Sequence, residues 1–311
     1  MISSRNVLVT GGAGFIGSHL VDRLVVGGRS VTVLDILSSG RERNLNIAAK
    51  LEKADIRSPE TREVMARAKP EIVFHLAAQI SVSASVRDPL LDADINIMGA
   101  LNVMEGARLA GARKIVFLST GGAMYGDPER LPADESLPAR PLSPYAASKR
   151  AFEQYLPVYK HSYGIDYSIV RPANVYGPRQ DPHGEAGVVA IFTRAMLEGK
   201  PCKLFGTGED ERDYIFVGDV VDLIVRAAEG TGTGPYNAGT GAGTSVNTLF
   251  TELARITGYS QPPVKAPPRH GDLHRISLDS SKARHELGWL HSMNLADGLA
   301  RTVEWFRQNP A

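Results

Sequence analysis

Short runs of apolar, β-branched residues alternate along this chain with segments in which apolar residues recur at helical spacing. A run over 7–10 is followed by a helical pattern over 15–26 and by a second run over 30–35. This order predicts a strand, a helix and a second strand. The alternation continues, with strands expected at 51–55, 72–76 and 114–119 and helices expected after Ser58-Pro59 and across 90–110.

Strands that are apolar throughout and separated by helices are typical of a parallel sheet buried on both faces. We therefore expect an α/β fold: a doubly wound parallel sheet of the Rossmann type with a smaller C-terminal α/β lobe for the substrate. Prolines and glycines make the pattern irregular beyond residue 172. We assign residues 1–175 to the dinucleotide-binding domain and 176–311 to an interleaved substrate lobe, and we expect 213–230 to return to the sheet.

Composition narrows the class of protein. Of 311 residues, 43% are hydrophobic and 22% are charged, as in folded globular domains. The 35 Lys and Arg nearly balance the 34 Asp and Glu, so no basic excess points to a nucleic acid or to a membrane surface. The single cysteine, Cys202, excludes an internal disulfide, and no spacing of metal ligands is visible. Without a signal peptide or a long apolar run, we expect a cytoplasmic protein with no metal.

Glycines at 11, 14 and 17 directly follow the first strand and open the first helix. Gly11 permits the tight turn, Gly14 allows close approach of a pyrophosphate, and Gly17 allows helix–sheet packing, while the N–H groups at the helix start bind the anion. Asp35 ends the second strand, where a carboxylate accepts hydrogen bonds from an adenosine ribose. This pattern predicts an NAD site, with NAD favoured over NADP because a 2′-phosphate would meet a like charge.

Further candidates for the cofactor site follow the next strands. Asp55 and Ile56 would cover the adenine, small residues after the fourth strand would let the cofactor lie close, and Asn96 contributes an amide from the next helix. Asn96 has an alternative interpretation as a brace within the fold, because a buried amide needs partners. The residues after the fourth strand are Leu76, Ala77, Ala78 and Gln79. Phe15 and Ile16 of the glycine turn also belong to the predicted cofactor-binding set, as do Tyr145 and Lys149.

A tyrosine and a lysine are spaced four residues apart in a predicted helix that starts with Ser143 as N-cap and Pro144 at the first position. Tyr145 and Lys149 therefore share one helical face. A phenol is about three pKa units too weak a base at neutral pH, and both an ammonium group and an oxidised nicotinamide would stabilise the phenolate. The alternative is a solvated helix face. We also expect Pro157 to bend this helix or end it early.

A hydroxyl group at the end of the fifth strand could act together with this pair. Ser119 and Thr120 are both placed there, at the sheet edge where ligands bind in such folds. Either hydroxyl could donate a hydrogen bond to the substrate oxygen that gains or loses a proton. We favour Thr120 and keep Ser119 as the alternative.

Together these residues resemble the extended short-chain dehydrogenase/reductases, and within them the NAD-dependent nucleotide-sugar 4-epimerases. The similarity extends over the whole chain and includes the glycine turn, the Tyr145–Lys149 pair, the segment from Arg171 to Arg179 and the segment from Gln180 to Val189. The resemblance implies that Tyr145 deprotonates the sugar 4-hydroxyl while carbon 4 passes hydride to NAD, and that the resulting 4-keto sugar rotates and recovers the hydride on its other face. UDP-glucose and UDP-galactose are the expected substrates.

The resemblance also assigns roles beyond the catalytic pair. Pro172 would contact the cofactor, and Asn174 and Val188 would contact the nucleotide-sugar. Arg212 and Arg269 would bind its phosphates, with surface ion pairs as the alternative, and Asp272 would hold its ribose. A homodimer formed through the helices at 90–110 and 145–163 is expected from the same source.

One position departs from the family pattern. Many epimerases carry the catalytic Ser or Thr four residues before the tyrosine of a Tyr-Gly pair, and Gly121 occupies that position here. Nucleotide-sugar 4,6-dehydratases resemble Thr-Asp-Glu at this point, and Gly121 and Gly122 cannot supply that acid and base. Dehydration is therefore disfavoured. The remaining alternatives are another nucleotide-sugar epimerase, a reductase, a decarboxylase or a non-catalytic protein that senses NAD.

Overall fold

The computed structural model describes residues 6–183, 187–268 and 273–310. A seven-stranded parallel sheet in the order β11-β6-β5-β4-β1-β2-β3 forms its centre. This architecture confirms the predicted α/β class and doubly wound sheet. The seven strands are β1 (Asn6–Thr10), β2 (Ser30–Leu34), β3 (Lys50–Glu52), β4 (Ile72–His75), β5 (Lys114–Leu118), β6 (Asp166–Pro172) and β11 (Tyr236–Ala238).

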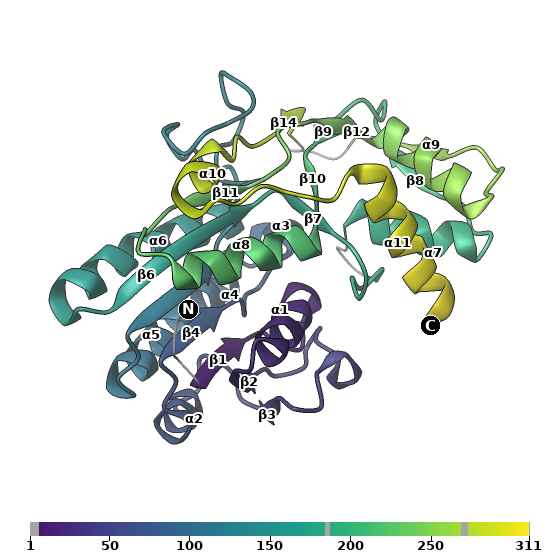
Figure 1. Ribbon diagram of the computed structural model, residues 1–311. Coiled ribbons are helices and arrows are strands. Elements are labelled where there is room, and N and C mark those ends of the chain that lie inside the picture. The colour runs from purple at the N-terminus through teal and green to yellow at the C-terminus, as the bar shows by residue number, and fades with distance from the viewer. Residues whose placement is uncertain (1–5, 184–186, 269–272, 311) are drawn as a thin grey trace.

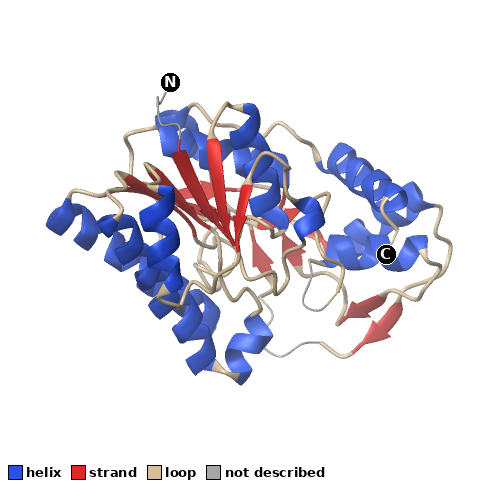
Figure 2. Cartoon of the chain, turned by 90° about the horizontal axis from the view of Figure 1, so that it is seen from below, coloured by secondary structure: helices blue, strands red, loops and turns tan. Residues whose placement is uncertain are grey.

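Helices cover both faces of this sheet (Figure 2). One hydrophobic core joins one face to α1 (Phe15–Val26) and α8 (Val217–Glu229), and a second joins the other face to α2 (Glu60–Ala68), α5 (Ala100–Leu109) and α6 (Pro144–Tyr163). All five residues of β5 are buried. Burial on both faces explains why the strands are apolar throughout rather than alternating.

The remaining elements build a lobe beside the carboxyl ends of the strands (Figure 1). Its helices α7 (Val188–Leu197), α9 (Val246–Thr257) and α11 (Leu295–Gln308) pack on one another around a third core. Its smaller elements are β7 (Asn174–Tyr176), β8 (Lys203–Phe205), β9 (Glu211–Arg212), β10 (Tyr214–Phe216), β12 (Thr244–Ser245), β13 (Val264–Ala266) and β14 (Arg275–Ile276). Helix α10 (Ser281–Leu287) instead packs against β11 and α8, where Ala283 joins the core of the main sheet.

The segment 213–230 divides between the two parts of the molecule. Its strand β10 pairs with β7 in a separate two-stranded sheet, so the expectation that this strand returns to the main sheet is wrong. The helix α8 that follows packs across the sheet, where its apolar face joins the same core as β1 and β5. The boundaries of the two domains stay a proposal.

Two predicted helices differ in detail. The helical run expected across 90–110 consists of α4 (Pro89–Ala93), a π-helical turn over Asp94–Gly99 and α5, preceded by a short helix α3 (Val82–Arg87). Of the two outcomes expected at Pro157, an early end of the helix is wrong, because α6 continues through Pro157 to Tyr163. The buried residues Phe152 and Leu156 anchor the helix to the sheet on the preceding turn, and this packing outweighs the lost hydrogen bond.

None of the helices in the described ranges is long and apolar enough to cross a membrane. Within the same ranges, no group of three or more His, Cys, Asp or Glu side chains is arranged to hold a metal ion.

Candidate active site

The loop between β1 and α1 contains the predicted glycine turn. Gly11 has a φ of +69°, and a Cβ atom there would lie 2.7 Å from the backbone nitrogen of Ala77. A Cβ atom on Gly17 would collide with the carbonyl oxygen of Gly11. Gly14 is the N-cap of α1 and has no side chain to accept a hydrogen bond from the first turn. The N–H groups of that turn therefore remain available to an anion such as a pyrophosphate.

A cavity of about 360 Å³ opens beside this loop, at the carboxyl ends of the strands. We call it the dinucleotide cavity. Sequence reasoning missed part of its wall, which includes Ser38 and Ser39 after Asp35 and Ile80 after Gln79, at positions to which no motif extends. The structure brings together twelve of the residues predicted to bind the cofactor, namely Gly11, Gly14, Phe15, Ile16, Gly17, Asp35, Asp55, Ile56, Leu76, Ala77, Ala78 and Gln79.

The Asp35 carboxylate is buried and fixed in this cavity. One of its oxygens accepts a hydrogen bond from the N–H of Ala13 at 2.9 Å, and the other accepts from the N–H of Leu37 at 2.8 Å. A carboxylate oxygen can accept two hydrogen bonds, so each keeps a position for a ribose hydroxyl. The glycine turn, the small residues Ala77 and Ala78 and this carboxylate fit NAD, and these residues would hold it.

Asp55 lies at the rim of the cavity in an ion pair. Its carboxylate is 2.6 Å from Arg57, which also contacts Asp94 at 2.9 Å. The hydrogen bonds from Arg57 hold the pKa of Asp55 below its usual value. Asp55 is therefore a charged, positioned group at neutral pH.

Asn96 lies in the π-helical turn and its amide is fully used within the protein. The side-chain oxygen accepts from the N–H of Gln79 at 2.9 Å, and the side-chain nitrogen donates to the carbonyl of Gln79, to Asp92 and to Ser148. Asn96 does not line the dinucleotide cavity. It joins the loop at Gln79 to α6, as in the alternative interpretation of a brace.

Tyr145 and Lys149 lie one helical turn apart at the start of α6. The helix begins as predicted, with the Ser143 hydroxyl accepting from the N–H of Ala146 at 3.2 Å and Pro144 at the first position. The pKa of Tyr145 is raised to about 12, mainly by burial; a hydrogen bond with Thr120 opposes this shift and the charge of Asp92 adds to it. Without further positive charge, Tyr145 is a neutral phenol.

The Lys149 ammonium group is buried next to a residue that lines the dinucleotide cavity. Its Nζ donates to the carbonyl of Leu118, a cavity residue, at 3.0 Å and lies 4.8 Å from the centre of the Phe117 ring. Burial lowers the pKa of Lys149 to about 8, against the charges of Asp92 and Glu153. The group therefore stays mostly protonated at neutral pH.

Ser119 and Thr120 have different partners. The Ser119 hydroxyl donates to Glu153 at 2.7 Å, and the same carboxylate accepts two hydrogen bonds from Arg171, at 2.9 and 2.6 Å. The Thr120 hydroxyl instead forms the hydrogen bond with Tyr145. Sequence reasoning missed Glu153 and Arg171, although Glu153 extends the spacing of four from Tyr145 through Lys149.

Most of the expected substrate residues lie on the lobe side. Asn174 is exposed at the start of β7, Val188 is the first residue of α7, and Arg212 lies in β9 with its guanidinium donating to the carbonyl of Glu211 at 3.0 Å. Pro172 ends β6, where its carbonyl accepts from Gly121 at 2.8 Å. Arg269 and Asp272 lie outside the described residues.

A hydrogen-bonded hydroxyl pair and a buried ammonium group beside a dinucleotide cavity are the groups needed to move a proton next to a hydride acceptor. The NAD dependent epimerase/dehydratase family matches residues 7–239. The chain belongs to this family. A UDP-glucose 4-epimerase of Mycolicibacterium smegmatis is 53% identical over 306 residues, covering 96% of this chain and 98% of the relative.

Solved structures of the family share the fold. A crystal structure of UDP-glucose 4-epimerase with UDP-glucose from Thermotoga maritima is 48% identical, covers 98% of this chain and 100% of its own, and superimposes with a TM-score of 0.96. A Thermus thermophilus UDP-glucose 4-epimerase in complex with NAD is 45% identical, covers 97% of this chain and 99% of its own, and has a TM-score of 0.93.

Proposed function

We propose that this protein is an NAD-dependent nucleotide-sugar 4-epimerase that interconverts UDP-glucose and UDP-galactose. The observation that carries the proposal is the hydrogen bond between Tyr145 and Thr120, one helical turn from Lys149. The Lys149 ammonium group donates to the carbonyl of Leu118, which lines the dinucleotide cavity. The similarity over nearly the full chain to enzymes named UDP-glucose 4-epimerase supports the choice of substrate.

The dinucleotide cavity would hold the coenzyme through the glycine turn, Asp35 and the Leu76–Gln79 loop. When bound, NAD+ supplies a reversible acceptor for the hydride of carbon 4 of the sugar. Asn96 acts through Gln79, because its amide fixes the loop that forms one wall of the cavity.

Tyr145 would take the proton of the sugar 4-hydroxyl and return it to the 4-keto oxygen after the sugar has turned. Ionising a phenol of pKa about 12 at neutral pH costs about 7 kcal/mol. The Lys149 ammonium and the charge of the oxidised nicotinamide, both in a medium of low polarity, would offset this cost. The Thr120 hydroxyl would donate to the sugar oxygen or to Tyr145, which leaves Ser119 as part of the Glu153–Arg171 ion pair.

The nucleotide part of the substrate would lie across the lobe. Asn174 would contact the diphosphate, Arg212 and Arg269 would bind its phosphates, and Asp272 would hold the ribose. Val188 would contact the nucleotide-sugar, and Pro172 would contact the coenzyme. The Thermotoga maritima relative, whose structure contains UDP-glucose, supports a UDP-sugar as the substrate.

Dehydration is disfavoured for a steric as well as a chemical reason. A Cβ atom at Gly121 would lie 2.8 Å from the carbonyl oxygen of Arg171, so the loop has no room for the acidic side chain of a dehydratase.

A screen of UDP-, dTDP- and GDP-sugars for inversion at carbon 4, with and without added NAD, tests the proposal. We expect conversion of UDP-galactose to UDP-glucose without net change in oxidation state. Release of CO2 or net consumption of reduced coenzyme would instead indicate a decarboxylase or a reductase. A protein that binds NAD and turns over none of these sugars would be an NAD sensor.

We also propose a cytoplasmic homodimer. Large apolar side chains are exposed on the two helical segments expected to form the interface, including Leu90 at 82%, Met98 at 60% and Val158 at 53%. These segments pack against one another, and exposed apolar side chains on neighbouring helices are typical of a subunit interface.

A further inference from the structure

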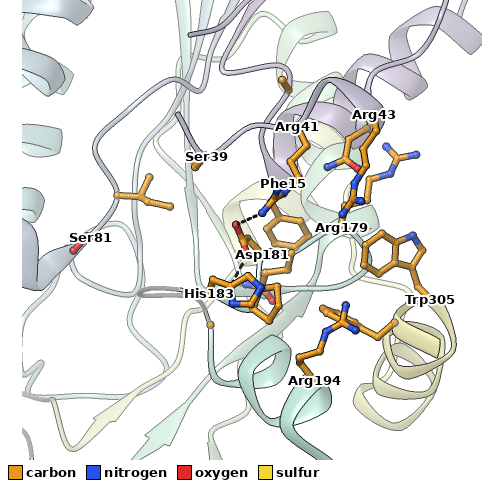
Figure 3. Close-up of a pocket in the computed structure, with 17 residues that line it drawn as sticks. Phe15, Ser39, Arg41, Arg43, Ser81, Arg179, Asp181, His183, Arg194 and Trp305 are labelled. Atoms are coloured by element: carbon orange, nitrogen blue, oxygen red, sulfur yellow. Dashed lines mark hydrogen bonds and ion pairs between the residues drawn. The ribbon is translucent and has the colours of Figure 1, made fainter. Parts of the chain in front are cut away.

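A second cavity, of about 590 Å³, shares Phe15, Ser39 and Ile80 with the dinucleotide cavity but extends toward the lobe (Figure 3). We call it the basic pocket. Its walls come from the loop after β2, the loop after β7, helix α7 and helix α11, and include Arg41, Arg43, Arg179, Arg194 and Trp305. In Figure 3 these labelled side chains surround one hollow.

Positive charge dominates these walls, with four guanidinium groups against the single carboxylate of Asp181. Arg41 is paired with Asp181 at 3.3 Å, and Arg179 and Arg194 are paired with carboxylates behind the wall, at 2.8 and 3.8 Å. Within the described residues, the exposed Arg43 guanidinium has no ion-pair or hydrogen-bond partner.

Arg194 is also incompletely satisfied. Its side chain is only 13% exposed, and within the described ranges its buried Nε has no hydrogen-bond acceptor. Buried guanidinium nitrogens without partners are costly, and an anion in the pocket would supply the missing acceptors.

An aromatic surface lies beside these charges. The Trp305 indole is partly exposed and packs edge-on against Phe306 at 5.1 Å, and the ring of Phe15 forms another part of the wall. Guanidinium groups bind phosphate through paired hydrogen bonds, and aromatic faces bind flat, apolar rings. A ligand with both features has a phosphate and a heterocyclic base.

We propose that the basic pocket is a second ligand site that binds a nucleoside phosphate, with the phosphate on Arg43 and Arg179 and the base against Trp305. The volume of the pocket lies in the range of small-molecule sites. None of these three residues takes part in the proposed epimerisation, so this inference stands independently of the proposed function.

Binding to the NAD-loaded protein in the presence of saturating UDP tests the inference. AMP, UMP and inorganic phosphate are titrated separately, by calorimetry and by the fluorescence of Trp305. The second tryptophan, Trp289, is buried and gives a constant background. We expect one nucleotide to bind saturably at one site, with inorganic phosphate at least about tenfold weaker because it lacks the base. Whether AMP or UMP binds more tightly identifies the source of the ligand.

Arg43→Gln should weaken the nucleotide about tenfold or more, through the loss of a charge-assisted hydrogen bond. Arg284→Gln, which removes the same charge from an exposed position on α10, is the matched control and should bind normally. Trp305→Phe should abolish the fluorescence change. As a control, the amount of NAD bound to each variant is measured, and NAD retained at the wild-type level shows that the dinucleotide cavity is intact.

The inference is overturned if neither nucleotide binds more tightly than about 1 mM, if phosphate alone binds as well as the nucleotides, or if Arg43→Gln and Arg284→Gln bind equally. Loss of epimerase activity has no bearing on these outcomes, because the titration requires only folded protein loaded with NAD.

Discussion

Ser119 and Thr120 are adjacent at the end of β5, and their hydroxyl groups have different hydrogen-bond partners. Ser119 donates to the buried Glu153, whereas Thr120 bonds Tyr145. Thr120→Val should therefore lower kcat about 100-fold, as expected for loss of a donor at the reacting oxygen. Ser119→Ala should leave kcat within a few-fold and lower the free energy of unfolding by about 1 kcal/mol. Steady-state kinetics and urea unfolding of both variants measure this difference, and a larger kcat loss in Ser119→Ala would reverse the assignment.

The charge of Lys149 predicts the pH dependence of the reaction. Its pKa of about 8 means that the wild-type rate should fall as the pH rises through about 8, because the neutral amine no longer stabilises the Tyr145 phenolate. Lys149→Ala removes the positive charge, which raises the pKa of Tyr145, so activity should begin at a higher pH and lack that alkaline fall. The pH profile of kcat/KM is the measurement. A variant with the wild-type profile would make Lys149 a structural residue.

At the scale of elements, helix α6 is longer than the proline in its sequence predicts. Pro157 has no N–H and leaves the carbonyl of Glu153 without its helical hydrogen bond, yet the helix continues to Tyr163. Pro157→Ala restores this donor and should raise the free energy of unfolding by about 1–3 kcal/mol. Gln154→Ala, an exposed position on the same helix, is the control. Denaturant unfolding measures both, and a destabilised Pro157→Ala variant would mean that the proline ring contributes packing that an alanine cannot replace.

Local chemistry accounts for the elements that the sequence predicts well. The glycine turn and α1 are defined by residues within one βαβ unit, and the start of α6 is defined by Ser143 and Pro144. Tertiary packing accounts for the errors. The pairing of β10 with β7 depends on the lobe, and the π-helical turn that carries Asn96 depends on the buried contacts of its amide with Gln79 and Ser148. The local sequence pattern predicts neither the pairing of β10 with β7 nor the contacts of Asn96.

In the candidate site, too, some residues could be predicted from the local sequence and others depend on the fold. Residues that follow a strand in sequence, such as Asp35 and Ala77, could be predicted because the carboxyl ends of parallel strands meet at one edge. Glu153 shares the spacing of four with Tyr145 and Lys149, but its ion pair with Arg171 could not be predicted, because the two residues come from different elements and meet only through the fold. The same holds for Ser39 and Ile80 in the loops around the dinucleotide cavity.

At the scale of the whole molecule, the exposed apolar side chains on α6 and on the helical run before β5 predict the assembly. Val158→Arg places a charge in the proposed interface and should convert the dimer to a monomer while preserving the fold, because an unpaired buried charge is costly. Light scattering with size-exclusion chromatography measures the mass, and circular dichroism checks the fold. A wild-type protein that is already monomeric would contradict the prediction.

A buried network also joins the two parts of the molecule. Arg171 connects Glu153 on α6 to Tyr125 at 3.0 Å, and Tyr125 donates to Asn237 on β11 at 2.8 Å. Asn237 in turn donates to the carbonyls of Ala133 and Asp279. Hydrogen bonds thus connect α6, through β6 and β11, to the segments at Ala133 and Asp279.

The rate of carbon-4 inversion of UDP-galactose by wild type and by Tyr145→Phe, with bound NAD determined in the same samples, tests the account most directly. Phenylalanine preserves the ring and removes the acid and base. We predict a folded variant with a full complement of NAD whose turnover is lower by about 1,000-fold. Turnover near the wild-type rate in that NAD-loaded variant would contradict the assignment of Tyr145 as the group that moves the proton.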